Sequence, residues 1–199
     1  IVMKFGGTSV QDAAAMDRTL SIAEARLPRA PVLLASAMAK VTDQLQQVAR
    51  LVGEGKQQEC DAVIAALEER HTACARQFLT PPHRERCLAD LAAILEQLRA
   101  LTRALSMLKE WSKRSNDAIL SFGERLSTTI LFHRARSRGI DAELFDAREL
   151  VKTDDTFTAA LPIEDLTAAA INARVKPRPG SLAITQGFIA STTGAMMRQ

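Results

Sequence analysis

The sequence predicts an α/β protein, a three-layer αβα sandwich in which helices cover both faces of a mostly parallel β-sheet. Two observations support this class. The apolar runs at 1–5, 31–35 and 181–185 have the length of buried strands and are too short for helices. After the first two runs, a turn leads into a longer stretch with helical periodicity, and strands that alternate with helices pair in parallel.

Composition narrows the class of protein. The 199 residues are 47% hydrophobic and 25% charged, as in a globular domain. The net charge of +3 is dispersed, and the chain has no tyrosine and one tryptophan, so neither a basic arm nor aromatic platforms favour nucleic-acid binding. No apolar run approaches the roughly 20 residues that cross a bilayer, and the start lacks a secretory pattern. We therefore expect a cytoplasmic protein.

The cysteines and histidines do not indicate a disulfide framework or a metal site. Both sets are widely spaced within helical-looking sequence, without paired-ligand spacing. We therefore expect reduced thiols and structural or surface imidazoles at Cys60, Cys74, Cys87, His71, His83 and His133.

The chain begins with a predicted strand, a glycine turn and a helix. The apolar run 1–5 ends at Gly6 and Gly7, and an Ala- and Leu-rich stretch follows from about Val10 to Arg26. Ser9 and the acidic residue three positions later have the spacing of a capping box, which predicts the start of this helix at Ser9.

A second strand at 31–35 is followed by a long helical region. The pattern is helical from about Thr42 to Gly139, with predicted breaks at 53–55 and 81–82, where glycines and prolines cluster. We interpret 42–115 as a helical insertion. A broad leucine stripe favours packing against the parent domain over a free coiled coil: Leu88, Leu91, Leu95, Leu98 and Leu105.

The remaining elements return to the α/β pattern. A helix from about Asn116 to Arg138 should end at Gly139, a favourable C-terminal cap, and a strand follows at 140–145. A helix is predicted at 163–173, and the turn 177–180 leads into the strand 181–185. Ligands of parallel sheets bind at the carboxyl ends of the strands, where the candidate motifs lie.

Lys4 and the turn after the first strand form a candidate phosphate site. The glycines allow close approach of a ligand, the following helix offers N–H groups, and Lys4 adds a positive charge that can offset the charge of a transferred phosphoryl group. The segment fits neither a Walker A loop nor a dinucleotide fingerprint. By itself a Gly-Gly turn is also compatible with a purely structural role.

Two further candidates lie at Ser36 and in the segment 121–127. Ser36 ends the second strand and could contact a ligand or cap the next helix. Gly123 lowers helix stability relative to alanine, so its presence needs an explanation. A ligand that lies against the helix and leaves no room for a side chain would provide one. Glu124 and Ser127 share a helix face, although Glu124 taken by itself is more typical of a solvated helical charge.

The motifs together resemble aspartate kinases of the amino acid kinase superfamily, whose fold is carbamate kinase-like. The matching segments are KFGGTSV at 4–10, LASAMAKVTD at 34–43 and SFGERLS at 121–127, with FDARE at 145–149, TDD at 153–155 and ITQGFIA at 184–190. The resemblance implies ATP-dependent phosphorylation of the side-chain carboxylate of L-aspartate to 4-phospho-L-aspartate, the entry to lysine, threonine and methionine synthesis.

The resemblance also implies roles for particular residues. Lys4 would be catalytic and would bind the ATP phosphates together with Gly6, Gly7, Thr8 and Ser9. Ser36, Thr42 and Glu124 would bind aspartate, with Glu124 holding its ammonium group. Mg²⁺ would accompany ATP, no residue is assigned to it, and the enzyme would be a homo-oligomer with lysine or threonine as a possible feedback effector.

The similarity stops near Gly194. The family continues into G-R-G-G-S-D, which carries the substrate-carboxylate arginine and the active-site aspartate, whereas this sequence ends in AMMRQ, and Arg198 lacks the flanking glycines and the Ser-Asp pair. We therefore expect 1–199 to be the N-terminal part of a catalytic domain, without the C-terminal nucleotide half and the ACT regulatory domains.

Three other functions stay open at this point. The chain could belong to an aspartate kinase fused to homoserine dehydrogenase. It could be a catalytically inactive aspartate-binding module. Another member of the superfamily, acting on glutamate or a nucleotide, is less favoured, because KFGGTSV and SFGERLS together favour aspartate.

Overall fold

The computed structural model describes residues 1–109 and 111–193, so the departure from the family pattern at 195–199, with Arg198, lies outside it. Its centre is a four-stranded sheet, ordered β1 (Val2–Phe5), β2 (Val32–Ala35), β5 (Ser181–Gln186) and β3 (Asp141–Phe145). Every neighbouring pair is parallel, which confirms the predicted sheet. The register places the last residues of β1, β2 and β5 side by side, so the carboxyl ends of these strands meet at one edge.

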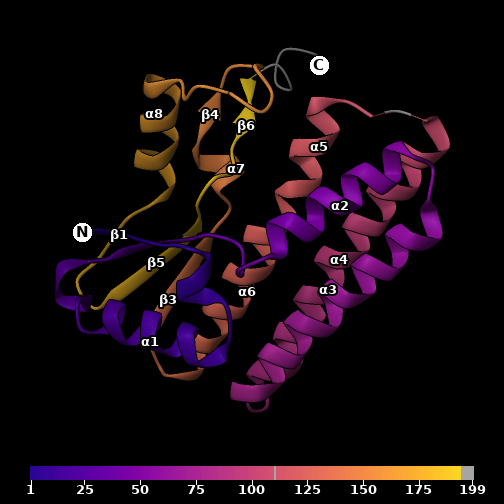
Figure 1. Cartoon of the computed structure of the whole chain (residues 1–199). Helices are drawn as coiled ribbons and strands as arrows, with labels where there is room; N and C mark the ends of the chain where they lie inside the picture. The colour runs from indigo at the N-terminus through magenta and orange to yellow at the C-terminus, as the bar shows by residue number, and fades with distance from the viewer. Residues whose placement is uncertain (110, 194–199) are drawn as a thin grey trace.

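Helices lie on both sides of this sheet, as predicted. On one face, α1 (Ala13–Glu24) and α6 (Phe122–Ser137) share the main hydrophobic core with β2 and β5. On the other face, α7 (Ala147–Leu150) and the segment after α8 (Glu164–Arg174) form a smaller apolar cluster with β3 and β5. Figure 1 shows α1 and α8 on opposite sides of the sheet. A short parallel pair, β4 (Lys152–Thr153) and β6 (Ser191–Thr192), lies near the carboxyl edge.

The region predicted to be helical contains α2 (Val41–Gly53), α3 (Gln57–Phe78), α4 (His83–Leu108) and α5 (Lys113–Leu120). The breaks between them fall at the predicted glycine and proline clusters. The leucine stripe of α4 faces inward: Leu91, Leu95, Leu98 and Leu105 are buried and Leu88 is partly buried. These side chains belong to the same core as the sheet, and Figure 1 shows the four helices as a group beside the sheet.

Two predicted helix boundaries are wrong. Asp12, rather than Ser9, caps α1, because its Oδ1 accepts a hydrogen bond from the Ala15 N–H at 2.8 Å. Ser9 lies in a short 3₁₀ helix, η1 (Gly7–Val10), so the α-helix starts at Ala13. The helix predicted from about Asn116 to Arg138 is two helices, α5 and α6, which meet at Ser121. The predicted end at Gly139 is confirmed, and its φ of +77° explains the glycine.

Cysteines 60, 74 and 87 are free thiols, as expected, and the structure buries all three. Within 1–109 and 111–193, no three His, Cys, Asp or Glu side chains are grouped so that they could hold a metal ion. None of the helices described is long and apolar enough to cross a membrane.

Candidate functional site

The glycine turn after β1 lies against the loop after β2. Ala39 donates its N–H to the Gly7 carbonyl at 3.1 Å, and a Cβ added to Gly7 would lie 3.0 Å from the Ala37 carbonyl oxygen. Gly7 is therefore required by this close backbone contact. Gly6 has no neighbour within 4 Å of an added Cβ, so its exposed side is open to a ligand. The first N–H groups of a helical turn such as η1 have no partner inside the turn and can bind an anion.

Lys4 places a positive charge beside this turn. The residue is exposed, and its Nζ lies 5.5 Å from the centroid of the Phe188 ring. Phe188 follows β5, has a φ of +66° and is 89% exposed. No described carboxylate forms an ion pair with Lys4, so its charge can meet a phosphate without first breaking a salt bridge.

Ser36 and Thr42 lie on the segment that joins β2 to α2. Ser36 is half-buried; its N–H donates to the Phe5 carbonyl at 3.1 Å, and its own carbonyl accepts from Ser127 Oγ at 2.8 Å. It does not cap α2, because the N-cap position is Lys40, in the left-handed conformation. The predicted cap role of Ser36 is thus wrong. Thr42 is exposed in the first turn of α2.

Glu124 is a buried carboxylate at the start of α6. It is 7% exposed, and its Oε1 accepts one hydrogen bond, from the Ala37 N–H at 3.3 Å. Burial raises the pKa of Glu124, and the bond from Ala37 opposes this shift only in part. Its side chain takes part in no described ion pair, so a cationic ligand at this position would relieve an uncompensated burial cost. The interpretation of Glu124 as a solvated charge is therefore wrong.

A side chain at position 123 would be too close to its neighbours, but these neighbours belong to the protein and not to a ligand. A Cβ at this position would lie 2.8 Å from the Ala37 Cβ, 3.1 Å from Leu45 Cδ1 and 3.3 Å from Val41 Cγ1. The glycine therefore lets α6 approach α2 and the loop before it. The expectation that a ligand fills this space is wrong.

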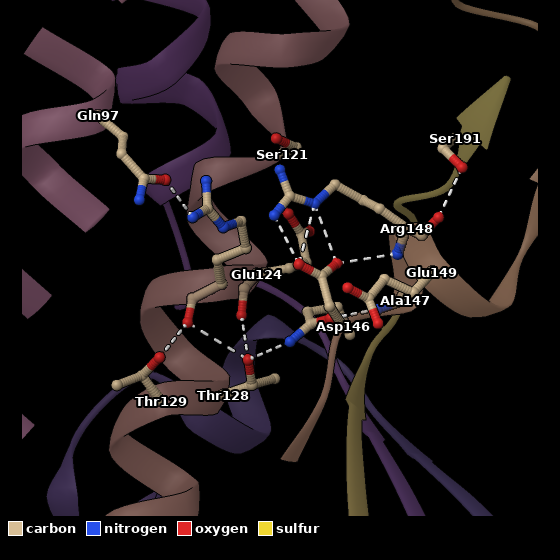
Figure 2. Close-up of polar contacts among 12 residues, drawn as sticks. Gln97, Ser121, Glu124, Thr128, Thr129, Asp146, Ala147, Arg148, Glu149 and Ser191 are labelled. Carbon is tan, nitrogen blue, oxygen red and sulfur yellow. Dashed lines mark hydrogen bonds and ion pairs between the residues drawn. The ribbon is translucent and has the colours of Figure 1, made fainter. Parts of the chain in front are cut away.

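Sequence reasoning did not assign a role to a buried polar network beside Glu124. Thr128 Oγ1 donates to the Glu124 carbonyl at 2.7 Å and accepts from Gln186 Nε2 at 2.9 Å, and Gln186 Oε1 accepts from the Ala147 N–H at 2.7 Å. Figure 2 shows the two ends of this chain of contacts, with Glu124 and Thr128 on α6 and Ala147 at the start of α7. Gln186 falls in the segment ITQGFIA, but a lone amide or hydroxyl in a sequence does not reveal its partners.

A group of arginines borders the same edge. Asp146 accepts hydrogen bonds from Arg148 at its backbone N–H and its guanidinium, and this partner lowers the pKa of Asp146 even though burial opposes the shift. Arg125 stacks 4.7 Å from the Phe122 ring centroid and donates to Gln97 Oε1 at 2.6 Å. Burial, aided by Arg148, lowers the pKa of Arg125 to about 10.

The structure brings most of the sequence candidates together. The Gly6–Gly7 turn contacts the 37–39 loop, this loop contacts Glu124, and Ser36 lies between β1 and α6. Thr8 and Ser9 belong to η1 on the same turn. This edge thus combines an exposed lysine beside an open backbone turn with a buried carboxylate, an arrangement that suits an anionic phosphate next to a substrate carrying an ammonium group.

Comparison with known proteins gives a consistent family match. The chain matches the amino acid kinase family over residues 1–198. It is 32% identical to the lysine-sensitive aspartokinase 3 of Escherichia coli, over 96% of this chain and 41% of that protein. It is 27% identical to a bifunctional aspartokinase/homoserine dehydrogenase 2, chloroplastic, of Arabidopsis thaliana, over 96% of this chain and 21% of that protein.

A solved structure agrees with the sequence match. The E. coli aspartokinase III in complex with aspartate and ADP superposes with a TM-score of 0.82 at 30% identity, over 97% of this chain and 41% of that chain. The chain therefore spans about two fifths of this solved structure and of the E. coli relative.

Proposed function

This chain belongs to the amino acid kinase family, and from that premise we propose that it supplies the aspartate-binding part of an aspartate kinase. The whole enzyme would transfer the γ-phosphoryl group of ATP to the side-chain carboxylate of L-aspartate. The observation that carries the proposal is Glu124: a buried carboxylate, without a described cationic partner, three residues from a serine that hydrogen bonds to Ser36.

Glu124 would hold the ammonium group of aspartate. A charge-assisted hydrogen bond at a buried carboxylate distinguishes an amino acid from a simple dicarboxylic acid, because the latter would leave Glu124 unpaired. Ser36 and Thr42 would contact the rest of the substrate. The side-chain carboxylate of aspartate is already ionised near pH 7, so the site needs to orient it rather than to remove a proton.

Lys4 and the turn formed by Gly6, Gly7, Thr8 and Ser9 would bind the ATP phosphates. Phosphoryl transfer depends mainly on positioning and on offsetting charge on the transferred group, and Lys4 supplies a positive charge that no described salt bridge neutralises. The reaction would be a direct transfer without a covalent enzyme intermediate. The product would be 4-phospho-L-aspartate, the first intermediate of lysine, threonine and methionine synthesis.

Mg²⁺ would enter with the nucleotide. It would supply further charge neutralisation at the phosphates.

The resemblance also supports proposals for the whole protein. They are a homo-oligomer and feedback control by lysine or threonine, in line with the lysine-sensitive relative. We also propose a cytoplasmic location, which suits three buried, unpaired cysteines.

The test is an ATP- and aspartate-dependent hydroxamate assay on the product of the whole gene that contains this sequence. The parent should form aspartyl hydroxamate and should use succinate, which lacks the ammonium group, poorly. Glu124→Gln should raise the aspartate KM at least tenfold, change the ATP KM little and weaken the discrimination against succinate.

The matched control is Glu164→Gln, the same change at an exposed residue of α8, which should leave both KM values unchanged. Absence of hydroxamate with the parent would refute aspartate kinase activity. An aspartate KM unaffected by Glu124→Gln would remove this residue from the site.

A further inference from the structure

We propose that Thr128 and Gln186 are positioning residues that fix the Glu124 carboxylate relative to the strand ends, and that they thereby set the affinity for the amino acid substrate. This inference rests on the proposed function. It assigns a role to two buried residues to which the proposed function gives none.

The network that connects these residues is buried and continuous. Thr128 is 0% exposed and Gln186 is 5% exposed. From the start of α7, the Ala147 N–H donates to Gln186 Oε1; Gln186 Nε2 donates to Thr128 Oγ1; and the Thr128 hydroxyl donates to the Glu124 carbonyl (Figure 2). Each step is between 2.7 and 2.9 Å long.

The chemistry of the groups fixes the direction of every bond in this network. A backbone N–H can only donate, so the Ala147 end of the Gln186 amide must be its oxygen, and the other end must be the NH₂ group. Thr128 then accepts from the amide and directs its proton to the Glu124 carbonyl at 2.7 Å, with a longer contact of 3.3 Å to the Arg125 carbonyl. The rotamer of Gln186 is thus fixed at both ends, which suits a residue that holds two elements in register.

The same turn of α6 is joined to the β2 end as well. Ser127 donates to the Ser36 carbonyl, and Glu124 accepts from the Ala37 N–H, both just after β2. Thr128 accepts from Gln186, the last residue of β5. Gln186 in turn accepts from the Ala147 N–H, which follows β3 at the start of α7. A single helical turn therefore connects the carboxyl ends of three strands.

This connection matters for Glu124 because its carboxylate is weakly held. Its one described hydrogen bond, from Ala37, measures 3.3 Å. The place from which the Glu124 side chain starts is set by its backbone, and the Thr128 bond acts on that backbone directly. Displacing a binding group by a fraction of an ångström weakens its contact with a ligand that other groups hold in place.

A purely structural role would give a different result, and Thr129 provides the control that separates the two. Thr129 is 5% exposed, and its hydroxyl donates to the Arg125 carbonyl at 2.8 Å, so it makes the same kind of bond within α6 as Thr128 does. It has no described bond to Gln186. Thr128→Val and Thr129→Val each remove a short hydroxyl bond to the carbonyl four residues earlier, and Thr128→Val also removes a longer contact of 3.3 Å to the Arg125 carbonyl, but only Thr128→Val breaks the network.

The experiment measures KM for aspartate and for ATP in the whole gene product. Thr128→Val should raise the aspartate KM about five- to twentyfold and the ATP KM less than twofold, since only the ammonium site is displaced. Thr128→Ser retains the hydroxyl and should restore the aspartate KM to within about twofold of the parent. Thr129→Val should leave both KM values near those of the parent.

Gln186→Met breaks the network from its other end and keeps the inference testable if Thr128→Val does not fold. It should also raise the aspartate KM selectively, and the double variant should be no worse than the weaker-binding single variant, because both changes break one chain of bonds. Equal effects of Thr128→Val and Thr129→Val, a parallel rise of both KM values, or full additivity would overturn the inference. A parent without aspartate-dependent activity would instead refute the proposed function.

Discussion

Two charged side chains at the candidate site lie in opposite environments. Lys4 is exposed, and its described partner is one face of an exposed aromatic ring, whereas Glu124 is buried beside a single N–H donor. An exposed charge can be removed at little cost in stability, and a buried one cannot be altered without changing its surroundings. Removal of the Lys4 charge should therefore lower catalytic turnover without lowering the stability of the fold.

For Lys4→Met we expect a loss of turnover by two or more orders of magnitude, because the charge that offsets the transferred phosphoryl group is removed. The thermal midpoint should hardly change, since a cation–π contact at an exposed site contributes only about 0.5–1 kcal/mol. Steady-state kinetics and thermal unfolding of the same preparation test both parts. Lys56→Met, at an exposed lysine paired with Glu54, is the control; turnover near the parent value in Lys4→Met would remove Lys4 from the mechanism.

His71 should make the stability of the fold depend on pH. Its side chain is fully buried in α3, its Nδ1 lies 2.6 Å from the Leu67 carbonyl, and its Nε2 has no described partner. Burial lowers the pKa of His71 from 6.5 to about 4. Between these values the unfolded chain binds a proton that the folded chain does not, so the free energy of unfolding falls as pH falls, by about 2 kcal/mol between pH 7.5 and 5.

His71→Asn should flatten this dependence, because the amide can still donate to the Leu67 carbonyl but does not titrate. Urea unfolding at pH 7.5 and pH 5 measures the difference. His83→Asn, at the partly exposed first residue of α4, should retain the steep dependence of the parent. An identical pH dependence in the parent and in His71→Asn would show that other groups are responsible.

At the scale of elements, α6 packs so closely against the loop before α2 that a methyl group added at Gly123 should not fit. Gly123→Ala gains about 1 kcal/mol in helix propensity, but its Cβ would lie 2.8 Å from the Ala37 Cβ. We expect a net loss of about 1–3 kcal/mol in stability and a higher aspartate KM, because the displaced loop also carries the Ala37 N–H that holds Glu124.

Gly53→Ala, at the end of α2, is the matched control for this substitution. Its Cβ would approach Trp111, a half-exposed side chain that can move, at 3.1 Å. Urea unfolding and kinetics of both variants decide the matter: if Gly123→Ala is as stable as the parent and binds aspartate normally, the close approach of α6 is not what positions Glu124.

The elements also show what sequence patterns can and cannot predict. The four parallel strands and the breaks of the helical region followed from apolar runs and from glycine and proline clusters, because these depend on local composition. The start of α1 was misplaced because Ser9 and Asp12 can both cap a helix, and no local pattern showed that residues 7–10 form a separate 3₁₀ turn. Glu124 was assigned by resemblance, whereas its partners and those of Gln186 come from three separate strand ends, which no local pattern encodes.

At the scale of the whole molecule, the helical region and the sheet share one core. Buried side chains run without interruption from Leu33 and Ile184 in the sheet, through Leu126 in α6, to Leu95 and Leu98 in α4. A helical segment that contacted the sheet only at its surface would have a separate hydrophobic core and could unfold independently of the sheet. The continuity of this cluster predicts a single cooperative unfolding transition.

The single tryptophan allows this to be tested. Trp111 lies against Gly53 at the end of α2 and shortly before α5, so its fluorescence reports on the helices, while far-ultraviolet circular dichroism reports on the whole chain. The two urea transitions should coincide. Leu95→Ala opens a cavity in the shared core and should reduce the free energy of unfolding by about 2–5 kcal/mol. Both urea midpoints should therefore move to lower concentrations together. Ile22→Ala, at an exposed residue of α1, should leave them in place. If fluorescence changes at a lower urea concentration than circular dichroism, the helices unfold first, and the α6 turn that carries Glu124 would then be attached to a region of lower stability.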